Sequence, residues 1–163
     1  MDLITIDRIK LMHPDKREHL KKIYIDVNNL LPKGVRLRFT HTLRTIAEQN
    51  YLYSQGRSRA GSIVTNAKGG QSIHNYGLAF DVVILLDEDG NGTFEKAVWN
   101  GKWFNIVVAE LKRYGFEWGG DWKFKDAPHF QYKKPDGTSY KWQELKTLLD
   151  AGKLIKSNGN NYP

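Results

Sequence analysis

Two side chains seven positions apart, His74 and Asp81, have the right chemistry to hold one divalent metal ion. Asp81 opens the apolar run 82–86, which is short and rich in β-branched residues, so it predicts a buried strand. An ionised carboxylate on a buried strand is costly unless it is paired or coordinates a metal. The alternative is a core aspartate bonded to a backbone group or an arginine, with His74 in an ordinary loop, and the local spacing leaves both interpretations open.

A second histidine, His129, would complete a set of three metal ligands. Three protein ligands with an open fourth position are typical of catalytic zinc, which lowers the pKa of water so that hydroxide attacks a carbonyl. Asp126, three residues before His129, is the candidate base that takes the water's proton and returns it to the leaving amine; its alternative is a turn aspartate. Arg44 is the candidate cation for the developing oxyanion, and its alternative is a surface ion pair.

The acidic segment 87–95 has the front half of a calcium-loop pattern. Oxygen-bearing side chains occupy its first, third and fifth positions, Gly92 is the sixth, and the eighth is apolar. The twelfth position is Val98, which cannot supply the bidentate carboxylate of a complete loop. A polar turn between two strands would have the same composition. The candidate calcium ligands are Asp87, Asp89, Asn91, Thr93 and Glu95.

The helix that follows Arg44 is predicted by a capping-box pattern, in which Thr45 is followed three residues later by Glu48. Within that helix, Ala47, Tyr51 and Leu52 are available for packing. Because Arg44 lies where a strand ends and this helix begins, its side chain is well placed to project into a cleft.

Periodicity and turn composition predict the remaining elements. The long loop 56–71 leads directly to His74, and is a candidate wall of a cleft. Segment 118–122, with two tryptophans and two glycines, either borders a groove or forms a core-packing turn. The expected elements are helices at 15–30, 46–55, 103–114 and 140–150, strands at 35–40 and 82–86, a strand beginning near 128, and a frayed polar tail at 156–163.

Composition limits the class of protein. A length of 163 residues suggests one domain, and 40% hydrophobic content is enough for a real core. The absence of cysteine excludes disulfides and thiolate zinc sites, so zinc would need histidine and carboxylate ligands. A net charge of +7 suggests an anionic partner, such as nucleic acid, anionic lipid or a cell-wall polymer, or simply a solvated basic surface. No nucleic-acid motif accompanies the scattered lysines and arginines, and no apolar run is long enough to cross a membrane.

Three motifs together resemble a known group of enzymes. They are Ser-x-His-x-x-Gly-x-Ala-x-Asp at 72–81, Trp-Gly-Gly-Asp-Trp at 118–122 and Asp-x-Pro-His-Phe at 126–130. The set is similar to the zinc peptidases of the lysostaphin, D-Ala-D-Ala carboxypeptidase and Hedgehog fold group, and most similar to its phage endolysin branch, the L-alanyl-D-glutamate endopeptidases. Segments 44–49 and 52–57 also resemble that branch.

The resemblance, which covers about residues 3–150, implies an α+β fold in which a small antiparallel sheet is flanked by helices and the metal lies at its open face. It implies a zinc-dependent peptidoglycan hydrolase that cuts the L-Ala–D-Glu bond of the stem peptide. Two alternatives are a D,D- or L,D-carboxypeptidase on the same scaffold and a non-catalytic cell-wall-binding module. The implied residues are His74, Asp81 and His129 on zinc, Asp126 as general base, Arg44 near the scissile carbonyl and Ser72 as a hydrogen-bonding support.

The resemblance also sets expectations for the whole protein. Residues 1–163 would form a single catalytic domain without a separate cell-wall-binding domain. The N-terminal segment has no secretory pattern, so we expect synthesis in a host cytoplasm and action on the wall after holin-type release. We expect a monomer whose partner is bacterial peptidoglycan, with no nucleic acid and no membrane insertion. The basic surface would then attract the enzyme to an anionic wall.

Overall fold

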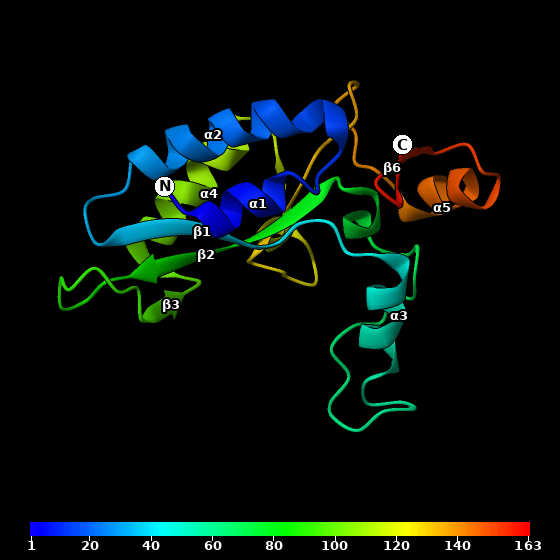
Figure 1. The fold of residues 1–163 in the computed structure, drawn as a ribbon, viewed down its shortest axis with the longest axis horizontal. Helices are drawn as coiled ribbons and strands as arrows, with labels where there is room; N and C mark the ends of the chain where they lie inside the picture. Colours follow the sequence, from blue (N-terminus) through cyan, green and yellow to red (C-terminus); the bar gives the residue numbers. More distant parts are fainter.

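The centre of the structure, a computed structural model that describes residues 1–163, is a five-stranded antiparallel sheet (Figure 1). Its strands are β1 (Val35–His41), β2 (Ala79–Leu86), β3 (Lys96–Val98), β4 (Glu117–Trp118) and β5 (His129–Gln131). β1 pairs with β2 along nearly its whole length. On the other edge of β2, β5 pairs with its first half and β3 with its second half, and β4 pairs with the outer edge of β5.

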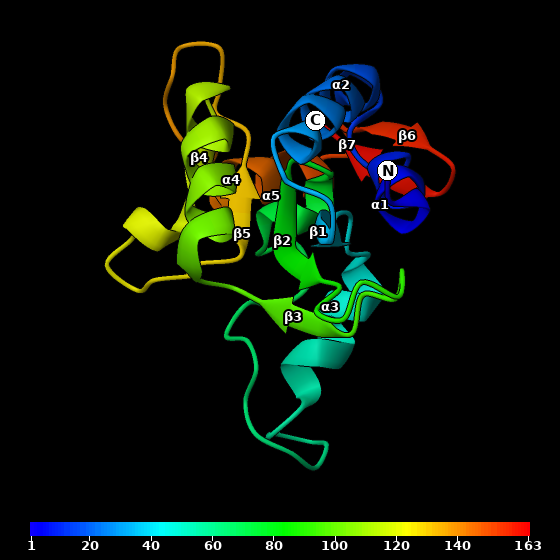
Figure 2. The ribbon, with the colours of Figure 1, turned by 90° about the vertical axis from the view of Figure 1, so that its left-hand side faces the viewer.

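Helices α1, α2 and α4 cover one face of this sheet, and one hydrophobic core joins them to it (Figures 1 and 2). The helices are α1 (Leu3–Ile9), α2 (Arg17–Asn29), α3 (Ile46–Ser54), α4 (Gly101–Arg113) and α5 (Trp142–Asp150), with short 3-10 turns η1 (Pro14–Lys16), η2 (Ile73–Tyr76) and η3 (Gly119–Asp121). No helix combines the length and the apolar composition needed to cross a membrane. The expected α+β fold, a small antiparallel sheet flanked by helices, is confirmed.

The core explains which face of the sheet carries the polar site. Phe39, Phe80 and Phe130 come from three adjacent strands and stack in a row beneath the helices, with ring centroids 4.5 Å and 5.8 Å apart. Side chains alternate between the faces of a strand, so the neighbours of Phe80 and Phe130 in the sequence point away from this core. Asp81 and His129 are two of those neighbours, and both therefore lie on the opposite face.

The predicted elements are largely confirmed, with one omission near the N-terminus. α2, α3, α4 and α5 lie within the predicted helical segments to a few residues, and β1 matches the predicted strand. β2 begins at Ala79, so Asp81 lies inside the strand and not at its start. Helix α1 was not predicted, although its N-cap Asp2 accepts a hydrogen bond from the backbone N–H of Thr5.

The expectation of a frayed tail at 156–163 was wrong. Strands β6 (Ile155–Ser157) and β7 (Asn160–Tyr162) form an antiparallel hairpin closed by Asn158 and Gly159, which both have positive φ angles. An Asn-Gly pair is a strong signal for this tight turn. The ring of Tyr162 is 1% exposed, and its hydroxyl donates to the carbonyl of Leu11 over 2.9 Å. A buried tyrosine anchors the segment despite its polar composition.

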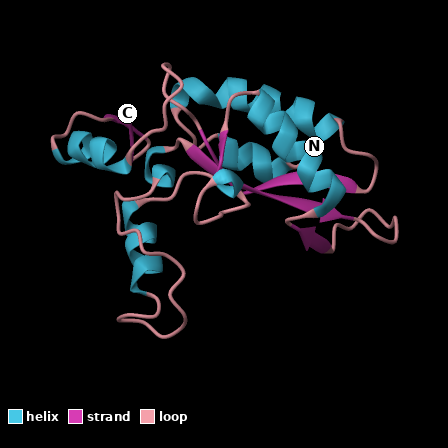
Figure 3. Ribbon diagram, turned by 180° about the vertical axis from the view of Figure 1, so that it is seen from behind, coloured by secondary structure: helices cyan, strands magenta, loops and turns pink.

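Helix α3 and the long loop after it project away from the sheet (Figures 1 and 3). Ala47, Tyr51 and Leu52, the residues available for packing, do not enter the core but line a cavity: only Gln49 of this helix is buried, and Tyr51 is 60% exposed. The predicted capping box of Thr45 is present and begins the helix. An arm with so few core contacts leaves its apolar side chains free to line a cleft beside the sheet.

Candidate metal centre and active-site cleft

Three side chains from three elements converge on the open face of the sheet. Asp81 of β2 and His129 of β5 are directly paired in the strand register, and His74 comes from the turn η2 just before β2. His74 Nε2 lies 3.2 Å from both Asp81 Oδ1 and His129 Nδ1, and His129 Nδ1 lies 3.3 Å from Asp81 Oδ1. Tetrahedral zinc with bonds of about 2.0–2.1 Å places its ligand atoms roughly 3.3 Å apart, so this donor set fits zinc.

The position of His74 is fixed by the local conformation of η2. Ser72 caps the turn by accepting a hydrogen bond from the backbone N–H of His74. Gly77 ends the turn at φ 65°, and a Cβ at that position would lie 2.7 Å from the Tyr162 ring. Glycine is therefore required there both for its backbone conformation and for the close approach of the C-terminal hairpin.

Each of the two histidines forms a hydrogen bond through the ring nitrogen that points away from Asp81. That bond selects the tautomer in which the other ring nitrogen, the one nearest Asp81, is unprotonated. His74 Nδ1 lies 2.7 Å from the carbonyl oxygen of Thr42 and donates to it, so Nε2 keeps its lone pair. His129 Nε2 lies 3.0 Å from Gln131 Oε1 and donates to it, so Nδ1 keeps its lone pair. Such outer hydrogen bonds orient metal-binding imidazoles and make them more basic.

The bond from His129 continues into a closed network of four side chains. The amide of Gln131 donates to Glu117 Oε2 over 3.1 Å, and the indole N–H of Trp122 donates to Glu117 Oε1 over 2.8 Å. The Trp122 ring returns to His129, with the two ring centroids 5.0 Å apart. Segment 118–122 therefore both borders the cleft, through Trp122, and packs against the core, through Trp118.

The electrostatics of the site favour an ionised carboxylate. Burial alone would raise the pKa of Asp81, but the neighbouring imidazoles of His129 and His74 outweigh burial and hold that pKa well below its ordinary value. Burial would likewise lower the pKa of His129, but the neighbouring carboxylate of Asp81 raises it. One ionised carboxylate beside two imidazole nitrogens is a set of donors that suits a divalent cation.

Asp126 lines a cavity of about 540 Å³ that also contains His74, Asp81 and His129. Its carboxylate accepts no hydrogen bond from the protein. Its backbone is held against the site, since its carbonyl accepts from the N–H of His129 and its own N–H donates to the carbonyl of Gly119. A Cβ on Gly119 would lie 2.5 Å from the Asp126 carbonyl oxygen, so glycine permits this approach. The loop after α3 also lines the cavity, through Val64 and Thr65, as expected for a cleft wall.

Arg44 lies on the wall of this cavity, and the surface ion pair considered for it is not formed. No carboxylate lies within 4.0 Å of its guanidinium, whose Nη1 donates to Gln49 Oε1 over 3.1 Å. Its backbone N–H donates to the carbonyl of His74. Sequence reasoning missed two further residues that line this cavity: His41, whose Nδ1 is 3.9 Å from Asp81 Oδ2, and Trp142 of α5. Only the pairing of distant strands and helices brings these two side chains here.

Residues 65–132, which include all three converging side chains, match a family model described as D-alanyl-D-alanine carboxypeptidase, of the M15 peptidases. Over 125 residues the chain is 42% identical to the peptidoglycan L-alanyl-D-glutamate endopeptidase CwlK of Bacillus subtilis. The matched region covers 74% of this chain and 72% of CwlK. The chain belongs to the M15 peptidase family.

The chain is also similar to a phage peptidase in sequence and to a solved structure in fold. The L-alanyl-D-glutamate peptidase of Listeria phage A118 is 30% identical over 100 residues, a match that spans 61% of this M15 peptidase but only 31% of the phage protein. The crystal structure of the Serratia marcescens L-Ala D-Glu endopeptidase ChiX superposes with a TM-score of 0.52, covering 83% of this chain and 91% of that one at 20% identity. At that identity the superposition shows that the fold is shared.

Proposed function

We propose that this M15 peptidase is a zinc-dependent peptidoglycan hydrolase that cuts the bond between L-Ala and D-Glu in the stem peptide. The observation that carries the proposal is the donor set: the inner atoms of His74, Asp81 and His129 lie 3.2–3.3 Å apart in a cleft. The bond specificity is supported by the relative CwlK, which is named for this bond and is 42% identical. The positive net charge favours an anionic wall as the partner.

Each polar residue of the cleft has a proposed role. His74, Asp81 and His129 would hold zinc, which when bound supplies Lewis acidity to water and to the scissile carbonyl. Asp126, whose carboxylate has no partner in the protein, accepts the proton of the attacking water and returns it to the departing amine of D-Glu. Arg44 supplies a cation on the wall of the cleft, where it stabilises the oxygen of the scissile carbonyl.

A second metal site is proposed in the loop between β2 and β3. Carboxylate oxygens of Asp87, Asp89 and Glu95 lie within 4.8 Å of one another, and Asp87 Oδ1 is buried without a hydrogen-bond partner. These oxygens, together with those of Asn91 and Thr93, are hard ligands of the kind that calcium prefers. We expect millimolar calcium to raise the melting temperature of wild type, and Asp89→Asn to abolish the rise; an unchanged melting temperature in wild type would exclude the site.

Digestion of purified peptidoglycan followed by mass spectrometry of the fragments tests the main proposal. Wild type should release peptides with a new N-terminal D-Glu, and His129→Ala should release none. His19→Ala is the matched control, because His19 is an exposed histidine of α2 remote from the cleft. Loss of a terminal D-Ala alone would assign the protein as a carboxypeptidase, and binding without cleavage by zinc-loaded wild type would make it a wall-binding module.

A further inference from the structure

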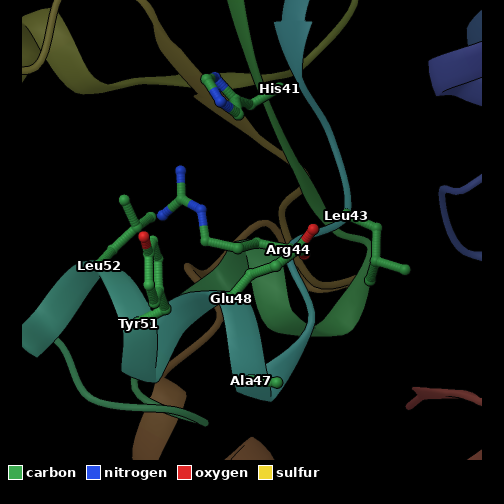
Figure 4. Close-up of a pocket in the computed structure, with 7 residues that line it drawn as sticks. All are labelled: His41, Leu43, Arg44, Ala47, Glu48, Tyr51 and Leu52. Atoms are coloured by element: carbon green, nitrogen blue, oxygen red, sulfur yellow. The ribbon is translucent and has the colours of Figure 1, made fainter.

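A second cavity, of about 530 Å³, adjoins the metal cleft and has no role in the chemistry described so far (Figure 4). It lies between His41 at the end of β1 and the exposed side of α3. The two cavities share His41, Arg44 and Leu52 in their linings, so they are immediate neighbours. A substrate whose scissile bond lies at His74, Asp81 and His129 has this second cavity beside it for one of its two sides.

Arg44 is the fixed charge in this second cavity. Its backbone is clamped to the metal-ligand turn, because its N–H donates to the carbonyl of His74 and its carbonyl accepts from the Asn75 side chain over 2.8 Å. The guanidinium is held by Gln49, which is fully buried and whose amide donates to the carbonyl of Ala67 over 2.8 Å. The cation is thus placed relative to His74 by the protein, before any ligand binds.

Most of the hydrogen-bonding capacity of Arg44 is unused. A guanidinium has five N–H donors, and the protein accepts a bond from Nη1 alone. The carboxylate of Glu48 also lines this cavity, but it forms no ion pair with Arg44 and instead accepts from the backbone and side chain of Thr45. Figure 4 shows the guanidinium between the side chains of α3 and His41. An unpaired arginine of this kind is suited to bind a carboxylate.

The rest of the lining is mainly aliphatic. Leu43, Ala47 and Leu52 supply apolar surface, and Tyr51 supplies an aromatic ring. A ligand that fits has a carboxylate on a short aliphatic chain. D-Glu in the stem peptide has this chemistry, because the chain continues from its side-chain carboxyl and leaves the α-carboxylate free unless that group is amidated.

We propose that this second cavity is the subsite for the D-Glu residue, in which Arg44 pairs with the free α-carboxylate through N–H groups that its contact with the scissile carbonyl leaves unused. The proposal rests on the proposed endopeptidase function and names what that function would select: stem peptides with D-Glu in preference to those with D-isoglutamine. Replacing the carboxylate by an amide removes one charge from a charge-assisted pair, so wild type should cut the amidated peptide with a kcat/KM about 10- to 100-fold lower.

The test uses two synthetic stem peptides that differ only in this carboxylate or carboxamide, with zinc-loaded enzyme throughout. Arg44→Gln should lower kcat/KM for the carboxylate peptide far more than for the amide, and so bring the ratio near one. Arg113→Gln is the matched control: Arg113 is an exposed cation of α4 that pairs with Glu110 and lines neither cavity, so its loss should leave the ratio intact. Melting temperature and zinc content would show that each variant is folded and loaded.

The outcomes separate this proposal from the one on which it rests. If wild type cuts both peptides equally well, the subsite assignment is overturned while the endopeptidase stands. If Arg44→Gln lowers both rates by the same factor and keeps the ratio, Arg44 serves only the scissile carbonyl, and the assignment is again overturned. If wild type cuts neither peptide, the proposed endopeptidase itself fails.

Discussion

Gln131→Leu should weaken zinc binding by removing the outer hydrogen bond of one ligand. In the structure Gln131 Oε1 accepts from His129 Nε2 over 3.0 Å, and its amide donates to Glu117. Both Gln131 and His129 are buried, at 4% and 6% exposure, so water cannot replace the lost acceptor. Leucine has a similar volume, and the substitution therefore removes the bonds and leaves the space filled.

The magnitude follows from the burial of the donor. A buried N–H left without an acceptor costs about 1–3 kcal/mol, which corresponds to roughly 5- to 150-fold in an equilibrium constant. Loss of an outer partner of a metal ligand typically costs 10–100-fold in metal affinity, which agrees with that range. The bond matters more with zinc bound, because a metal on Nδ1 makes the Nε2–H a stronger donor.

Chelator competition measures this affinity directly, with activity followed in parallel. Gln143→Leu is the control, since Gln143 is exposed on α5 and its side chain forms no hydrogen bond with the protein. We expect the Gln131 variant to release zinc at a lower chelator concentration than either wild type or the control. A Gln131→Leu protein that is folded and binds zinc within about twofold of wild type would refute the argument that this network supports the site.

Three further predictions concern the framework. Asp2→Asn should destabilise the fold by about 2–4 kcal/mol, because the buried Asp2 makes a two-point pair with Arg38 at 2.8 and 3.0 Å. Burial would raise the pKa of Asp2, but its hydrogen bonds with Arg38 and Thr5 lower it. In thermal melts, the difference in stability between wild type and Asp2→Asn should therefore be complete above pH 3.8 and become smaller as the pH falls below that value. Gly119→Ala should cut activity at least tenfold with folding retained in circular dichroism, because the added Cβ meets the Asp126 carbonyl at 2.5 Å; normal kcat would contradict this. Tyr162→Ala should cost about 3–5 kcal/mol in denaturant unfolding, as expected for a buried aromatic ring, and a loss under 1 kcal/mol would show that the hairpin is dispensable.

The sequence pointed to His74, Asp81 and His129 as candidate ligands through local patterns. Asp81 precedes a continuous apolar run that predicts a buried strand, where an ionised carboxylate is costly unless it is paired, and His74 lies seven positions before it. His129 alternates with the aromatic residues of its strand, so period-two spacing places it on the face opposite Phe130. The register that pairs Asp81 with His129 was not predictable, since it is set by contacts between segments far apart in the chain.

What the sequence did not reveal depends on such distant contacts. Gln49 is a polar residue in a weakly amphipathic helix, and its role in holding Arg44 follows only from burial against Ala67 in the long loop. The carbonyl of Thr42 fixes the His74 ring, but any residue could supply a carbonyl, so no side-chain signal marks it. The C-terminal hairpin did carry a signal, the Asn158-Gly159 turn, which polar composition outweighed.

The docking of Tyr162 against Gly77 sets an order of events during synthesis. The two residues touch across 85 intervening steps of the chain, and Gly77 ends the turn that carries His74. At about 5–20 residues per second, roughly 4–17 seconds pass between translation of the turn and translation of its support. During that interval the turn can make its contacts with Thr42 and Arg44, which precede it in the chain, but it lacks the Tyr162 ring. The packing around the turn that carries His74 is therefore complete only when nearly the whole chain has been translated.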